Sequence, residues 1–224
     1  MYLSKNNVKE EKIIRPHRQK KQTLYCVRFF IVTIVLVFSM MLSSCVQKPV
    51  ADARYINIDS ILQAQEKILS ASPTLLSHEI RLDDKIVRNT SKSLDSAGWA
   101  TELGEFSRLT AINKPTYKGT FAIEDGLRDA NSNLTVKALI NTARLPIKYV
   151  KLYYQDHPFK LRKIESLYAE GEKNLLYKSS RLFVLEFRDI YNKTMLSSYS
   201  IKGGQKILAG DTIEFAIRGI ITIE

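Results

Sequence analysis

Strict alternation of apolar and polar residues marks the C-terminal half of the chain and limits the folds open to it. The alternation is clearest in the segment "DTIEFAIRGIITIE" (211–224). One face of this segment carries only apolar side chains: Ile213, Phe215, Ile217, Ile221 and Ile223. A period of two is the mark of a strand with one face packed and the other in water. This segment therefore predicts a strand of an antiparallel sheet.

Six further segments before it have the same strand-like composition. All seven lie past Pro115, at 117–124, 133–141, 147–155, 159–170, 175–187, 194–203 and 211–224. Turn residues separate them, among them Glu124-Asp125-Gly126, Asp156-His157, Gly171 and Gly203-Gly204. Successive strands joined by short turns predict an antiparallel meander. A sheet of about seven strands is expected to curl.

The region before the sheet predicts two helices and a hairpin. Asn57 or Asp59 can cap a helix that Pro73 ends, and the residues around Asp83-Asp84 alternate as in a short hairpin. The second helix, "SLDSAGWATELGEFSRL" (93–109), has Trp99 on its apolar side. We therefore expect a single α+β domain, 56–224, which is helical over 56–112 and β-rich over 116–224. Its two N-terminal helices and small hairpin would pack on the curled sheet.

An apolar run near the N-terminus predicts a targeting segment. Phe29–Leu42 is 14 residues long, which is short for a membrane span but suits the centre of a secretion signal. Eight Lys and Arg residues precede it, and the small residues Ser43 and Ser44 follow, directly before Cys45. An uncleaved anchor helix with an inert Cys45 is the alternative.

The motif Leu42-Ser43-Ser44-Cys45 resembles the lipobox of bacterial lipoproteins. The resemblance implies that residues 1–44 are a signal peptide, that the sulfur of Cys45 carries a lipid, and that 45–55 form a tether to the membrane. Because Val46 replaces the aspartate that retains such proteins at the inner membrane, it also implies an outer-membrane protein facing the periplasm. The segments "INKPTYKGTF" (112–121) and "YSIKGGQK" (199–206) resemble Bacteroidetes-type envelope lipoproteins of this length.

Composition argues against several classes of function. The formal charge is +11, but residues 1–44 carry +6 of it, and no arginine-rich stripe indicates a nucleic-acid partner. The two cysteines of the chain are Cys26, in the leader, and Cys45. The region after Cys45 therefore has no thiol for a disulfide, a nucleophile or a metal. We expect no cofactor and no metal.

Candidate chemistry is sparse after Cys45. His78 and His157 have no partner at catalytic or metal-ligand spacing, so no enzyme is expected. Five aromatic residues either fill the core or line a groove for a lipid: Trp99, Tyr149, Tyr153, Tyr154 and Tyr177. The sequence thus favours a non-enzymatic binding module for a lipid or hydrophobic envelope component. The alternative is an accessory lipoprotein that binds a protein partner by a sheet edge, such as 211–224.

Overall fold

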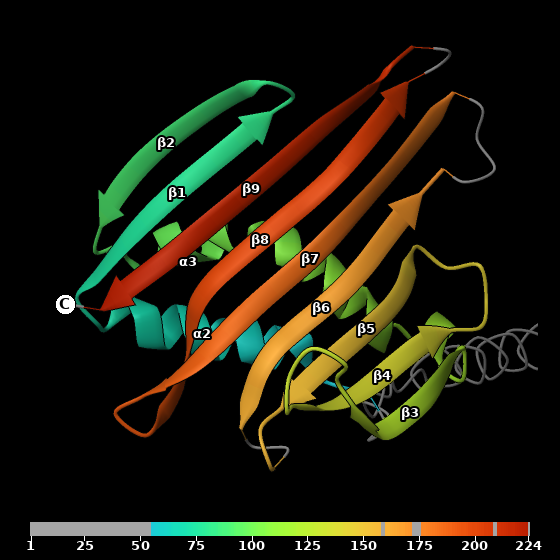
Figure 1. Ribbon diagram of the computed structural model, residues 1–224, viewed down its shortest axis with the longest axis horizontal. Coiled ribbons are helices and arrows are strands. Elements are labelled where there is room, and N and C mark those ends of the chain that lie inside the picture. Colours follow the sequence, from blue (N-terminus) through green and yellow to red (C-terminus); the bar gives the residue numbers. More distant parts are fainter. Residues whose placement is uncertain (1–54, 158–159, 172–175, 208–209, 224) are drawn as a thin grey trace, which may run out of the picture. The chain divides into compact units, whose positions relative to one another are not determined.

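A computed structural model describes residues 55–157, 160–171, 176–207 and 210–223. The chain divides into two units, 1–50 and 51–224, and all described residues belong to the second. That unit is dominated by one antiparallel sheet of nine strands in the order β2-β1-β9-β8-β7-β6-β5-β4-β3 (Figure 1). The predicted α+β class with an antiparallel meander is confirmed.

The strands follow the predicted segments closely. They are β1 (Thr74–Leu82), β2 (Lys85–Lys92), β3 (Phe121–Arg128), β4 (Thr135–Asn141), β5 (Ile147–Tyr154), β6 (Leu161–Glu170), β7 (Tyr177–Ile190), β8 (Lys193–Ile207) and β9 (Thr212–Ile223). The seven strands after Pro115 are those expected from the sequence. The sheet reaches nine because the predicted hairpin, β1–β2, joins it: β1 pairs with β9 along its whole length.

This pairing corrects one expectation about the edges of the sheet. The segment 211–224 was the predicted example of an edge, but β9 lies between β1 and β8. The strands at the two ends of the order are β2 and β3. The reason is topological, because the N-terminal hairpin covers the side of β9 that the meander leaves open.

Helix α2 (Ile58–Ser70) begins as predicted, with the Asn57 side chain accepting a hydrogen bond from the Ser60 backbone amide at 3.1 Å. Its buried side includes one polar residue, Gln65, which is only 6% exposed. The Gln65 amide donates to the carbonyl of Thr194 and its oxygen accepts from the backbone amide of Leu196. Gln65 thus fastens the helix to β8.

The second predicted helix forms in two parts. An α-helix, α3 (Ser96–Glu102), gives way to a 3₁₀ helix, η1 (Gly104–Asn113), and a short 3₁₀ turn, η2 (Pro115–Tyr117), follows. The change falls next to Gly104, a poor helix former. Trp99, expected on the apolar side, is nevertheless fully buried, and so are Leu103 and Phe106.

Two predicted turns are wrong. Gly203-Gly204 lies inside β8, where a side chain on Gly203 would meet the carbonyl of Ser180 and the ring of Phe215. Glu124-Asp125-Gly126 lies inside β3, where the register with β4 shifts and Gly126 has a φ of +77°. In both places the glycine is part of a strand. In β8 it allows neighbouring groups to approach closely, and in β3 it allows a bulge.

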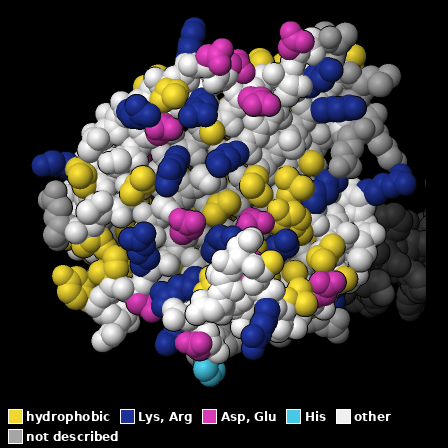
Figure 2. Space-filling model, in the orientation of Figure 1, with side chains coloured by type: hydrophobic (Ala, Val, Ile, Leu, Met, Phe, Trp, Pro, Cys, Tyr) yellow, Lys and Arg dark blue, Asp and Glu magenta, His cyan; other side chains and the backbone are white. Residues whose placement is uncertain are grey.

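The helices and one face of the sheet enclose a single apolar core. All the described helices lie behind the sheet in Figure 1, and the opposite face carries none of them. Aromatic rings fill the core, with Phe106 against Phe183 at 5.4 Å and against Tyr199 at 5.9 Å between ring centroids. Figure 2 shows the helix-free face, on which acidic and basic side chains are interspersed with apolar ones.

Within the described residues, no helix is both long enough and apolar enough to cross a membrane. The predicted signal segment, the lipid-attachment residue Cys45 and most of the predicted tether 45–55 lie outside these residues.

Candidate functional site

The aromatic residues predicted to line a groove lie in different parts of the domain. Trp99 is fully buried in the core beneath the helices, and Tyr154 packs against the same core. Tyr177 begins β7, opposite Ile207 of β8, and is partly exposed. None of these three residues lines either of the two hollows described below.

Tyr149 and Tyr153 belong to a polar network outside that core. Their hydroxyls donate to the two carboxylate oxygens of Glu165, at 3.1 and 3.4 Å. Lys163 donates to the same carboxylate, and its ammonium lies 3.8 Å from the centroid of the Tyr153 ring. Burial and the Glu165 charge raise the pKa of Tyr149 to about 12. These hydroxyls therefore stay protonated at neutral pH and hold strands β5 and β6 together.

A second polar cluster, which no sequence motif indicates, lies on the helix side. The hydroxyl of Tyr199 donates to Glu102, and Nε2 of His78 lies 3.6 Å from the same carboxylate oxygen. Gly219 faces both His78 and Tyr199 in the sheet, and a side chain there would collide with the Tyr199 ring. Register across three strands creates this contact, so no local motif could have revealed it. Desolvation, the largest cause, raises the pKa of the Tyr199 hydroxyl well above its ordinary value, and Glu102 adds to this.

Neither cluster has the composition of a metal site. Within the described part of the chain, no three His, Cys, Asp or Glu side chains are grouped so that they could hold an ion. His157 lies in the exposed turn after β5.

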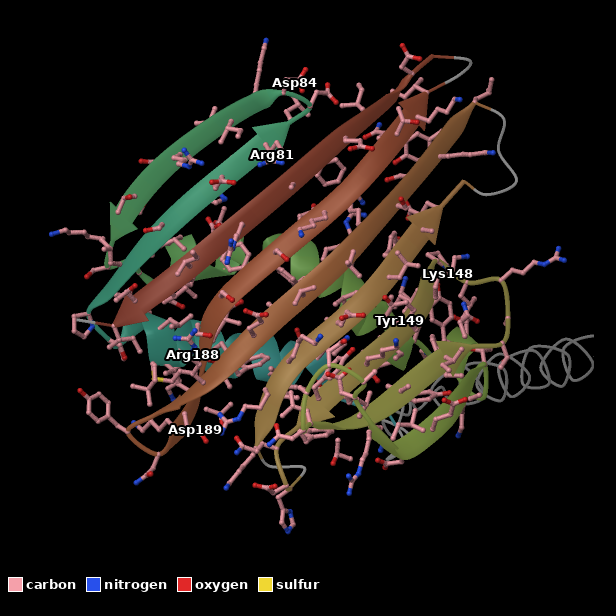
Figure 3. The ribbon with its side chains drawn as sticks, viewed as in Figure 1. Arg81, Asp84, Lys148, Tyr149, Arg188 and Asp189 are labelled. Carbon is pink, nitrogen blue, oxygen red and sulfur yellow. The ribbon has the colours of Figure 1, made fainter. Side chains whose placement is uncertain are left out.

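An apolar hollow of about 440 Å³ lies between the end of α2 and the β7–β8 turn. Most of its lining is apolar: Ile68, Ala71, Pro73, Ile190, Met195 and Ile223. Lys67 and Lys193 also line it, and both are exposed. Tyr191, in the left-handed turn that joins the two strands, lines it as well and is 90% exposed. Figure 3 marks this end of the sheet by Arg188 and Asp189.

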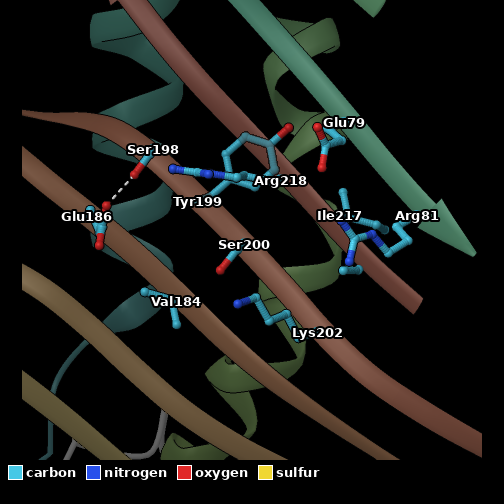
Figure 4. Close-up of a pocket in the computed structure, with 11 residues that line it drawn as sticks. Glu79, Arg81, Val184, Glu186, Ser198, Tyr199, Ser200, Lys202, Ile217 and Arg218 are labelled. Atoms are coloured by element: carbon cyan, nitrogen blue, oxygen red, sulfur yellow. Dashed lines mark hydrogen bonds between the residues drawn. The ribbon is translucent and has the colours of Figure 1, made fainter. Parts of the chain in front are cut away.

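A second hollow, of about 430 Å³, opens on the helix-free face over β1, β9, β8 and β7 (Figure 4). Register explains its shape. Ser200 of β8 lies opposite Val184 of β7 and Arg218 of β9, and Arg218 lies opposite Glu79 of β1. Short side chains, Ser200 of β8 and Ala216 of β9, thus lie beside long charged ones on the two middle strands.

The charges around this second hollow are unevenly paired. Glu79 forms an ion pair with Arg88 at 2.8 Å, and Glu186 accepts a hydrogen bond from Ser198 at 2.5 Å. The hydrogen bond from Arg88, together with the positive charges of Arg81 and Arg218, lowers the pKa of Glu79. Glu79 is therefore ionised at neutral pH, and both carboxylates are already engaged.

Comparison with known proteins yields no relative: no family model, no curated protein and no solved structure matches the chain.

Proposed function

We propose that the chain is a lipid-anchored protein of the bacterial envelope that binds a lipid or another hydrophobic envelope component without catalysing a reaction. The anchoring part rests on the sequence of the leader. A basic flank, the apolar run Phe29–Leu42, two serines and Cys45 follow in the order that a lipoprotein signal requires. A covalently attached acyl chain contributes about 0.8 kcal/mol per buried methylene, so several chains at Cys45 would hold the protein permanently.

The observation that carries the binding part is the apolar hollow at the end of α2. Its volume, about 440 Å³, lies within the range of pockets that accept small ligands. An acyl segment placed against Ile68, Met195 and Ile223 would lose contact with water at a gain of about 25 cal/mol per Å². The ammonium groups of Lys67 and Lys193 would remain in water beside an anionic headgroup.

Mass spectrometry of the native full-length protein tests both parts. Acylation at Cys45 adds a mass that Cys45→Ser lacks, and a bound lipid appears as a separate, non-covalent species. Retention of the intact leader on the wild-type protein in cells would overturn the anchoring proposal.

A matched pair of substitutions in α2 and its cap tests the hollow. Ala71 and Ala64 are both exposed, but only Ala71 lines the hollow. We expect Ala71→Trp to fill the hollow and remove the co-purifying lipid, and Ala64→Trp to retain it. Equal lipid content in both variants, or none in the wild-type protein, would contradict the binding proposal.

One observation supports a second candidate, a protein partner bound by a sheet edge. Strand β2 is an edge strand and is exposed at seven of its eight residues, with Val87 62% and Ile86 44% exposed. An exposed edge strand presents unpaired backbone groups and is therefore a template for strand addition. A photo-crosslinking residue at Val87 is expected to capture a specific envelope protein in cells, whereas one at Thr116, outside the sheet, is not.

A further inference from the structure

Three cations of the described residues line the hollow on the helix-free face without a hydrogen bond or an ion pair, although the charges of Arg81 and Arg218 act on Glu79. The three cations are Arg81, Lys202 and Arg218. Two other cations of the sheet form ion pairs. Arg162 lies 2.6 Å from Asp189, and Lys163 lies 3.1 Å from Glu165. Like charges on adjacent strands destabilise a sheet, so three cations around one hollow repel one another.

The three cations line one hollow from three different strands. In Figure 4 the Arg218 side chain extends from β9 over β8 toward Ser198, and the Lys202 ammonium points toward Ser200. Ala216 lies opposite both Arg81 and Lys202 in the sheet, so a methyl group alone separates these two long cations. The Ser200 hydroxyl adds a neutral donor to the floor, whereas that of Ser198 donates to Glu186.

The acidic groups of the hollow neutralise these cations only in part. Glu79 is already paired with Arg88, outside the hollow, and Glu186 accepts from Ser198. Arginine presents donors in a planar fork that matches the oxygens of a phosphate, and an ammonium adds a point charge. A multiply charged oxyanion would relieve the repulsion among the three cations.

We propose that this hollow binds a phosphate group, held by the guanidinium groups of Arg81 and Arg218, the ammonium of Lys202 and the hydroxyl of Ser200. The phosphate is either a free ion or the headgroup of a lipid, since both present the same oxygens. The site lies on the face of the sheet opposite the apolar hollow, so it does not depend on the proposed function.

Isothermal titration of the full-length protein in a neutral detergent tests the proposal. One arm adds inorganic phosphate and the other adds phosphatidic acid in the same micelles, both at constant ionic strength, with chloride as the reference. Saturable binding of inorganic phosphate identifies a soluble ligand, whereas binding of phosphatidic acid alone identifies a lipid headgroup, and either result supports the site. Heat no greater than that of chloride in both arms would overturn it.

Variants connect binding to the named residues. We expect Arg218→Gln to raise the dissociation constant of the phosphate ligand about tenfold, because one charge-assisted hydrogen-bonding group is lost. The double variant, Arg218→Gln with Lys202→Gln, is expected to abolish binding. Arg188→Gln removes the same charge from an exposed position outside the hollow and is expected to leave the constant within about twofold. Since all three positions are exposed, unchanged circular dichroism should accompany each substitution. Equal effects of Arg218→Gln and Arg188→Gln would refute the assignment.

Discussion

At the scale of single residues, Gln65 is the polar group on which the attachment of α2 depends. Replacing it by leucine would increase apolar burial yet leave the buried amide of Leu196 and the carbonyl of Thr194 without partners. Each unsatisfied buried group costs about 1–3 kcal/mol. We therefore expect Gln65→Leu to lower the free energy of unfolding by about 2–4 kcal/mol. Urea unfolding followed by the fluorescence of Trp99, the single tryptophan, measures this change.

Gln63 supplies the matched control in the same helix. It is exposed, and its amide donates only to the exposed Asp59. Gln63→Leu is expected to change the unfolding free energy by no more than about 0.5 kcal/mol. Similar losses in the two variants would show that leucine at any position of this helix is harmful and that the bonds to β8 are not the cause.

At the scale of elements, the close packing of β7, β8 and β9 depends on the absence of a side chain at Gly203. An added Cβ there would lie 2.2 Å from the carbonyl oxygen of Ser180 and 2.9 Å from the ring of Phe215. We expect Gly203→Ala to destabilise the domain by about 1–3 kcal/mol, the usual cost of overpacking. Gly104→Ala, where nothing lies within 4 Å of the added atom, should be near neutral in the same assay. A neutral Gly203→Ala would mean that β8 can shift away from β7.

The strands β6 and β7 are also joined by an ion pair with a defined pH dependence. Arg162 donates to Asp189 at 2.6 Å, and this bond, with a second from Thr194, lowers the pKa of the Asp189 carboxyl. A carboxyl whose pKa falls on folding stabilises the folded protein fully at pH values above its unfolded-state pKa, which is about 3.9. This stabilisation is lost as the pH falls through the folded-state pKa. The melting temperature of the wild-type protein should therefore approach that of Asp189→Asn between about pH 5 and pH 2. A difference in melting temperature between the two proteins that stays constant over this pH range would contradict the expected contribution of Asp189. The effect is small because the ion pair is partly exposed.

The elements themselves could be predicted from local pattern, because cap, period and turn chemistry are short-range properties. Asn57 marks the start of α2, and the seven late strands repeat with a period of two. Gly203 could not be interpreted correctly, because glycine in a turn and glycine beneath a neighbouring ring look the same in sequence. Nor could either hollow be predicted, since each depends on which strands become neighbours.

At the scale of the whole molecule, the sheet joins the beginning of the domain to its end. The central strands β7 and β8 are paired on both sides, whereas β2 and β3 are each paired on one side only. Local opening of a domain begins where the fewest hydrogen bonds and apolar contacts must break. We therefore expect hydrogen exchange to proceed at least about a hundredfold faster in β2 than in β8.

The same measurement distinguishes a free edge from an occupied one. Strand β3, the other edge, serves as the internal reference, because it is exposed at all but its first residue, much as β2 is. Protection of β2 that rises with protein concentration, while β3 stays fast, would show that a second copy pairs with β2. Protection of β2 as strong as that of β8 in dilute protein would contradict the expected order. Fast exchange in the purified protein that becomes slow only in envelope extracts would instead favour a protein partner at this edge.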